Sequence, residues 1–243
     1  MQIPSLPELL EAGAHFGHQA NHWHPKMAPY IYGARGGVHI IDLEKTQERL
    51  KGALEVVKNL VAQGGVVLFV GTKPQAKSVV KSAALSCGMP FVTERWLGGT
   101  LTNFRQLRET INRYVKLREQ QEKGELDEKY TKMERLLIAR EIEEDQVKVG
   151  GIENMKKLPD AIFISDIRHD KTALMEAVGS HVKVIGVCDT NVNPEHVDEV
   201  IPMNDDAVRS IQMVYELLAE AVNEGKATAA QKEGKKEIKE QEV

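Results

Sequence analysis

Short apolar runs alternate with helical patterns along most of the chain, and this alternation restricts the fold more than any other feature. The run at 66–70, Val-Val-Leu-Phe-Val, precedes a helical pattern, and similar runs occur at 90–92, 161–164, 182–187 and 200–202. Strands that are apolar at nearly every position are typical of a parallel sheet covered by helices on both faces. The sequence therefore predicts an α/β fold, a flavodoxin-like doubly wound parallel sheet of about five strands. An earlier run at 38–41 precedes a long helix and is expected to add a ribbon at the edge of this sheet.

The alternation is interrupted once, at residues 103–148, which carry no strand signal. Apolar residues at helical spacing form one stripe before Gly124 (Leu107, Ile111, Tyr114, Leu117) and another after it (Tyr130, Met133, Leu137). This pattern predicts an inserted antiparallel helical hairpin, a coiled-coil arm. Because the arm has few large apolar groups, we expect it to pack against a partner. The expected segments are 1–102, the N-terminal segment and first half of the α/β domain; 103–148, the arm; 149–225, the second half; and 226–243, a charged flexible tail.

Composition excludes several classes of protein. Hydrophobic residues make up 42% of the chain and charged residues 28%, which is ordinary for a globular protein, and no apolar run reaches transmembrane length. The first residues resemble neither a signal peptide nor a transit peptide, so we expect a cytoplasmic protein that does not enter membranes. Cys87 and Cys188 lie in apolar runs, the usual context of buried reduced thiols, which excludes a disulfide framework.

Charge is distributed unevenly along the chain. The formal net charge is -4, but residues 71–118 contain nine Lys or Arg against two acids, and residues from 141 onward contain 12 basic against 22 acidic side chains. Such a division indicates one face directed at an anionic partner and another kept away from it, although two solvated charge runs would give the same counts.

The signatures of nucleotide-binding enzymes are missing. Gly71-Thr72-Lys73 resembles the end of a phosphate-binding loop, but the upstream glycine has the wrong spacing and Pro74 replaces the hydroxyl residue. The chain also contains neither Gly-x-Gly-x-x-Gly nor Gly-x-Ser-x-Gly. A phosphate- or nucleotide-binding α/β enzyme or sensor that uses Lys73, Asp166 and Asp189 remains the alternative function, and it predicts saturable binding of a phosphoryl compound.

Acidic residues follow several strands, and histidines crowd the N-terminus. Acids at the carboxyl ends of parallel strands can bind a hard cation, but they also cap the helices that follow. Five of the eight histidines precede residue 40, without a cysteine among them, so their spacing fits no closed zinc site. The candidate metal ligands are His15, Asp189, Asp205 and Asp206.

The histidine-rich loop also has a composition that suits RNA. It contains Asn21, Trp23, Lys26, Tyr30 and Arg35, and aromatic planes stack on bases while cations meet phosphates. An ordered loop that packs Trp23 and Tyr30 onto the sheet is the other interpretation.

Five ordered blocks of sequence resemble one known family. They are LLEAGAHFGH at 9–18 with WHPKMAPYI at 23–31, HIIDLEKT at 39–46, VLFVGTK at 67–73, RWLGGTLTNF at 95–104, and the stretch from Asp189-Thr190-Asn191 through Ile201-Pro202 to NDDA at 204–207. Over residues 5 to about 225 the chain is similar to small-subunit ribosomal protein two of the bacterial type; His24 stands where Asn is expected.

The resemblance implies a non-catalytic component of the small ribosomal subunit, with no cofactor and no small-molecule substrate. It implies binding to small-subunit ribosomal RNA, contact with neighbouring small-subunit proteins, and a docking platform for the large ribosomal protein one. A scaffold that binds proteins without RNA is a third possibility. Each cation can equally be a solvated surface residue. The expected RNA-binding residues are Lys26, Arg35, Lys73, Lys77, Arg95, Trp96, Arg105, Arg108 and Arg113.

Overall fold

A five-stranded parallel sheet forms the centre of the protein. The computed structural model describes the backbone of residues 2–241 and the side chains of residues 2–127 and 129–231. The strands lie in the order β5-β4-β6-β7-β8. Their bounds are β4 Val67–Val70, β5 Phe91–Val92, β6 Ala161–Ile164, β7 Lys183–Cys188 and β8 Glu199–Pro202. The second strand lies outside the first and the later strands follow on the other side, which is the flavodoxin-like order, so the predicted fold class is confirmed.

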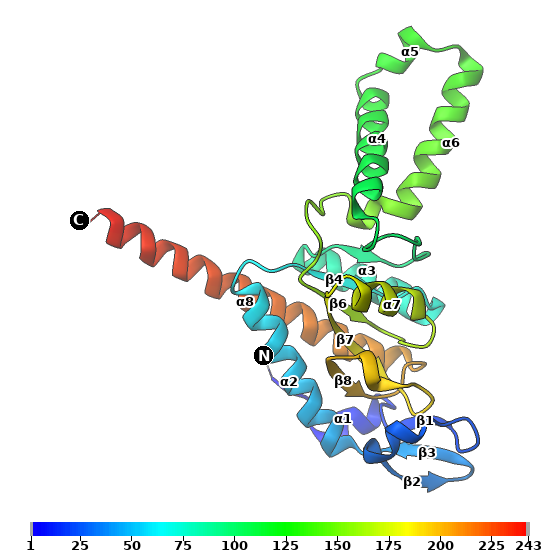
Figure 1. The fold of residues 1–243 in the computed structure, drawn as a ribbon, viewed down its shortest axis with the longest axis vertical. Coiled ribbons are helices and arrows are strands. Elements are labelled where there is room, and N and C mark those ends of the chain that lie inside the picture. The colour runs from blue at the N-terminus through cyan, green and yellow to red at the C-terminus, as the bar shows by residue number, and fades with distance from the viewer. Residues whose placement is uncertain (1, 242–243) are drawn as a thin grey trace.

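Helices cover both faces of this sheet (Figure 1). Because side chains alternate along a strand, Phe69 and Phe163 point to one face while Leu68 and Ile162 point to the other. Two separate apolar cores result, which explains why these strands are apolar at every position. The first face packs against α2 (Leu43–Val61), α3 (Pro74–Cys87) and α8 (Val208–Gln241), and the second against α7 (Lys171–Gly179) and the base of the arm.

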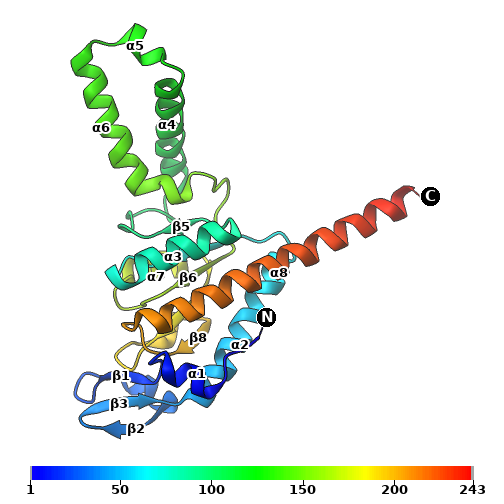
Figure 2. The same ribbon diagram turned by 180° about the vertical axis from the view of Figure 1, so that it is seen from behind.

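Two long helices, α4 (Phe104–Glu122) and α6 (Lys132–Val149), project together from one end of the molecule, as Figures 1 and 2 show. The short helix α5 (Glu125–Lys129) joins them at the tip, and Gly124 before it has φ +73°, a left-handed conformation that suits glycine. The 3-10 turn η2 (Gly150–Ile152) follows α6 at the base.

The two predicted apolar stripes of the arm differ in burial. Leu107, Ile111 and Tyr114 are buried as predicted. The expected second stripe is wrong, because Tyr130, Met133 and Leu137 are exposed, by 41%, 66% and 55%. The helices converge towards the base, and α5 lies between them at the tip (Figure 1). The first turns of α6 lie beside this short helix, where Arg135 pairs with Asp127, and α5 does not cover Met133 or Leu137. The residues of α6 that are buried lie nearer the base, at Ile142 and Val149.

A separate three-stranded antiparallel sheet lies at the end opposite the arm (Figure 1). Its order is β1-β3-β2, with β1 at Phe16–Gln19, β2 at Ile31–Arg35 and β3 at Val38–Ile41. The expected edge ribbon at 38–41 is therefore wrong: these residues form the middle strand of a second sheet. Its partner strands contain glycine and polar residues, so they carry no apolar pattern that would reveal them. Helix α1 (Leu6–Glu11) precedes this sheet, and the 3-10 helix η1 (Pro25–Tyr30) leads into β2.

Helix α8 continues far beyond the body of the protein (Figure 2). It includes residues 226–241 of the expected tail, whose flexibility stays a prediction; residues 242 and 243 lie outside the described residues. The remaining short element is the 3-10 helix η3 (Pro194–His196). Among the described residues, no helix is both long enough and apolar enough to cross a bilayer.

Candidate functional site

Four charged side chains meet at the carboxyl edge of the central sheet. Lys73 Nζ lies 3.0 Å from Asp166 Oδ2, 2.9 Å from Asp205 Oδ1 and 2.6 Å from Asp206 Oδ1. Burial works to lower the pKa of Lys73, but the hydrogen bonds to these carboxylates outweigh it and raise the pKa. The ammonium of Lys73 is therefore already paired with carboxyl groups, and a phosphate placed beside it would lie next to three acidic side chains. This geometry disfavours the alternative in which Lys73 binds a phosphoryl group.

His18 joins this cluster from the antiparallel sheet. A side chain at Gly17 would bring its Cβ to 2.6 Å from Thr190, so glycine allows β1 to approach the end of β7 closely. The backbone N–H of His18 then donates to Thr190 Oγ1 at 2.9 Å, and its Nδ1 lies 2.9 Å from Asp189 Oδ2. The hydrogen bond with Asp189 raises the pKa of the His18 imidazole.

A possible cation site lies among the described residues at His18, Asp189 and Asp205, whose ligand atoms are all within 4.8 Å of one another. The two carboxylates are 1% and 2% exposed. Burial, together with the charges of Asp166 and Asp189, raises the pKa of Asp205 to about 7. Two buried carboxyl groups thus lie next to an imidazole nitrogen, a ligand set that suits a divalent metal ion.

The predicted metal ligands are only partly brought together. Asp189 and Asp205 lie in the cluster, and Asp206 Oδ2 is 3.7 Å from His18 Nε2. His15 is not among the residues of the possible cation site; its ring stacks on Phe16 with centroids 4.0 Å apart. The sequence did not single out His18, because only the pairing of β1 shows which histidine faces β7. Asp166 does not cap the helix that follows, because Asp170 is the N-cap residue of α7. Asp166 Oδ1 accepts from Arg168 N and His169 N at 2.8 Å each and so stabilises the turn before α7.

Several of the cations predicted to bind RNA make contacts within the chain. Lys26 pairs with Glu195, Lys77 Nζ lies 2.5 Å from Glu94 Oε2, and Arg113 pairs with Glu141. These pairs involve exposed acids, and such surface pairs are weak enough to exchange for a phosphate. Arg108 donates to the carbonyl of Met155 at 2.9 Å and helps to hold the arm on the body.

The other predicted cations are more exposed. Arg105 is 95% exposed, and its Nε lies 3.9 Å from Glu109. Arg35 and Arg95 are also exposed. Arg95 and Arg105 flank the start of the arm, whereas Arg35 lies in the antiparallel sheet at the opposite end (Figure 1). The predicted cations therefore divide between two ends of the molecule and do not form one patch.

Trp96 has a role inside the fold. It is 8% exposed, and its Nε1 donates to Glu176 Oε1 at 3.1 Å. The same carboxylate accepts from the backbone N–H groups of Gly99, at 2.8 Å, and Leu101, at 3.0 Å. Glu176 lies on α7, so this network ties the loop before the arm to the body. A buried indole in such a network offers no face for a base to stack on.

Tyr32 is the residue that the sequence reasoning missed. It lies in β2 and is 81% exposed, and Trp23 in the preceding loop is 41% exposed. The interpretation in which Trp23 and Tyr30 pack onto the sheet holds for Tyr30, which packs against the core of the central sheet, whereas Trp23 contacts His39 of β3, with ring centroids 5.4 Å apart. The sequence did not predict the exposure of Tyr32, because this exposure depends on the pairing of β2 with β3. The alternation of side chains between the two faces of β2 could have suggested it.

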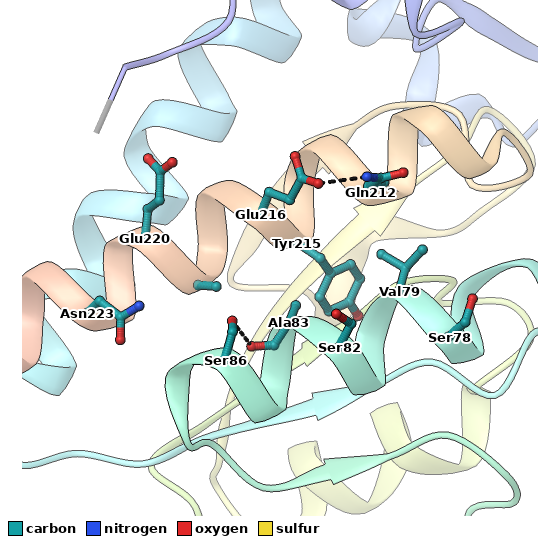
Figure 3. A pocket seen from close by; sticks show the side chains of 11 residues that line it. Ser78, Val79, Ser82, Ala83, Ser86, Gln212, Tyr215, Glu216, Glu220 and Asn223 are labelled. Atoms are coloured by element: carbon teal, nitrogen blue, oxygen red, sulfur yellow. Dashed lines mark hydrogen bonds between the residues drawn. The ribbon is translucent and has the colours of Figure 1, made fainter.

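A polar groove between α3 and α8 lies away from these residues (Figure 3). It is lined by Ser78, Ser82 and Ser86 on one side and by Gln212, Glu216 and Glu220 on the other. It contains none of the residues that the sequence predicted as a site, and its acidic wall would repel nucleic acid.

The comparison with protein families agrees with the resemblance found in the sequence blocks. A family model described as "Ribosomal protein S2" matches residues 9–225, which include the central sheet, the antiparallel sheet and the arm. The predicted relationship is confirmed. The chain belongs to the ribosomal protein S2 family, whose members are structural proteins of the small ribosomal subunit.

Proposed function

We propose that this chain binds small-subunit ribosomal RNA with two separate surfaces, one at each end of the molecule. The observation that carries the proposal is the exposure of aromatic and cationic side chains together on the antiparallel sheet and its loop: Trp23, Lys26, Tyr32 and Arg35. Exposed large aromatic side chains often mark a binding surface. Because cations lie beside these rings and attract phosphates, we infer that the rings stack on the bases of a nucleic acid.

The second surface is the base of the arm. Arg95 and Arg105 are exposed there, Lys116 continues the exposed cations along α4, and Arg113 faces a single exposed acid. Each Lys or Arg that contacts a phosphate releases counterions, so this surface supplies affinity without base specificity. The aromatic surface supplies register, because single-stranded bases stack on exposed rings. Lys73 and Trp96 are left out of the proposed surfaces, since both are engaged inside the fold.

The test of this function is binding of the full chain to small-subunit ribosomal RNA across a salt series. We expect Tyr32→Ala combined with Arg35→Glu to weaken binding by roughly tenfold, in line with the loss of one stacked base and one phosphate contact. Lys51→Glu changes an exposed lysine on α2, away from both surfaces, and serves as the matched charge control. Equal affinity of the double variant and the control would refute the role of the antiparallel sheet.

We further propose that the acidic side of the protein faces other proteins, ribosomal protein one among them. Exposed Glu8 and Glu11 of α1 lie near Glu216 of α8, which also belongs to the acidic wall in Figure 3. Phosphates would be repelled from this side. Binding that survives ribonuclease and is lost when Glu216 and Glu220 are changed to Gln supports this assignment.

A divalent cation at His18, Asp189 and Asp205 is also part of the proposal. Such an ion would neutralise buried carboxylates and would join β1 to the ends of β7 and β8. Titration of the metal-stripped chain with Zn²⁺, followed by calorimetry, tests it. Equal binding by the native chain and His18→Ala would show that the ion is bound elsewhere.

A further inference from the structure

An apolar groove lies at the amino-terminal edge of the central sheet, opposite the acidic cluster. It has a volume of about 850 Å³. Its walls come from the end of α2 with the turn that follows it, the end of α3, the start of β5, the turn η2 at the base of the arm, and α8 where this helix leaves the body. Leu85 on its rim is 63% exposed, and Met89 and Phe91 line it. An exposed leucine beside a cavity of this size marks a surface where burial of an apolar side chain would be favourable.

The groove is held rigidly by close backbone contacts. A Cβ at Gly151 would lie 2.2 Å from the carbonyl oxygen of Phe91, so the base of the arm and β5 touch through their backbones. On the other side, Lys226 of α8 donates to the carbonyl of Cys87 at 2.5 Å, which fixes α8 across the end of α3. A groove that is already formed loses little conformational entropy when a ligand enters it.

The rim of the groove is basic. Lys156, Lys157 and Lys226 line it, against one acid, Glu153. Glu153 is engaged by Arg118, at 2.7 Å, and Lys157 by Asp160, at 3.2 Å. Lys156 is exposed, and no ion pair of Lys156 occurs among the described side chains. Beyond the groove, residues 226–241 contain five lysines against three glutamates. The charge of this region therefore complements an anionic partner.

The lining indicates a protein partner in preference to RNA. Binding of single-stranded RNA in a groove relies on exposed aromatic planes, and the one aromatic side chain in this lining, Phe91, is half-buried against Gly151. The accessible groups are aliphatic, at the exposed Leu85 and the half-buried Pro90, and such groups receive apolar side chains. We propose that this groove binds a segment of a neighbouring small-subunit protein that carries a large apolar side chain flanked by carboxylates.

In this arrangement the apolar side chain of the partner fills the groove beside Leu85. The flanking carboxylates pair with Lys156 and with Lys226 on the rim. Apolar burial supplies the anchor, and the rim charges select an acidic segment over a basic one. The interaction surface is distinct from the proposed RNA surfaces, because none of its lining residues belongs to them.

The test is photo-crosslinking in the assembled subunit. The full chain is produced with p-benzoylphenylalanine in place of Leu85, an exposed position where substitution leaves the core intact. Small subunits that contain it are purified, irradiated and analysed by mass spectrometry. We expect a crosslink to one protein segment that contains Asp or Glu next to a large apolar residue.

A second change separates specific docking from chance proximity. Lys156→Glu in the same chain is expected to lower the crosslink yield roughly tenfold, because it places like charge opposite the partner. Lys51→Glu, on α2 but outside the lining of the groove, is the control and should leave the yield unchanged. The proposal is overturned by a crosslink to RNA, by a crosslink to a second copy of this chain, by no crosslink in subunits that contain the chain, or by a yield that Lys156→Glu does not lower.

Discussion

Replacement of Glu176 by Gln tests how the arm is attached to the body. The Glu176 carboxylate accepts hydrogen bonds on both oxygens: Oε1 from Trp96 Nε1 and Gly99 N, and Oε2 from Leu101 N and Thr102 N. Glutamine keeps the shape but replaces one oxygen with an NH₂ group. Whichever way the amide turns, two donors lose their acceptor and face another donor instead.

The expected cost follows from these contacts. Glu176 is 9% exposed, so water does not readily replace the lost acceptor. A hydrogen bond to a buried charged group contributes about 1.5 kcal/mol or more, and the loss of two therefore lowers the free energy of unfolding by about 3 kcal/mol. With a urea dependence of roughly 2 to 3 kcal/mol per molar, the unfolding midpoint falls by about 1 M.

The assay is urea unfolding followed by the fluorescence of Trp96. The chain has two tryptophans, so Trp23→Phe leaves Trp96 as the single reporter, next to the changed residue. Glu220→Gln, an exposed glutamate on α8, is the matched control and is expected to shift the midpoint little. A Glu176→Gln midpoint within about 0.2 M of that control would refute the reasoning, because it would correspond to about 0.5 kcal/mol.

The dependence of stability on pH gives an independent test of the role of Glu176. Burial acts to raise the pKa of Glu176, but the hydrogen bonds from Leu101, Gly99, Trp96 and Thr102 outweigh it, and the pKa lies below its usual value. A lowered pKa in the folded state means that this stabilisation is fully present above the unfolded pKa of about 4.3 and is lost as the pH falls through the lower folded value. The difference in stability between the native chain and Glu176→Gln should therefore narrow below about pH 4.3.

Three further outcomes are expected. Arg105→Glu should lower the salt slope of RNA binding by roughly 0.7 to 0.9, whereas an unchanged slope in filter binding would remove Arg105 from the RNA surface. Lys73→Met leaves Asp166, Asp205 and Asp206 without their shared cation and should reduce the free energy of unfolding at pH 7 by about 3 kcal/mol, measured in urea; a loss below about 1 kcal/mol would contradict the proposed role of this ammonium. His18→Ala should abolish calorimetric Zn²⁺ binding at the cluster while leaving the circular dichroism spectrum unchanged.

Much of the fold could be predicted because its signals are local. The runs at 66–70 and 161–164 are apolar at every position, since both faces of their strands are covered. The first stripe of the arm was equally readable, because Ile111 and Tyr114 recur at helical spacing and face the body. The family relationship could be predicted from several sequence blocks in the same order, and it did not depend on the position of any single residue in the fold.

The candidate site was less predictable, because exposure and pairing are properties of the whole fold. Lys73 and Trp96 have the residue types of an RNA surface, yet Asp205 and Glu176 engage them inside the protein. Neither partner is near in sequence. The choice of His18 over His15 likewise depends on a contact with Asp189, which is far along the chain.

The sequence by itself determined the order of strands and helices in the central α/β domain, the place where the arm interrupts them, and the family. These features follow from hydrophobic periodicity and from ordered motifs, and both depend on residues that are close together in the sequence. Only the tertiary structure decided that residues 38–41 form the centre of a second sheet, that the distal face of α6 is exposed, and which cations remain available to a partner. Sheet pairing, burial and ion pairing join residues that are distant in the chain, and the local pattern of a sequence does not contain those distances.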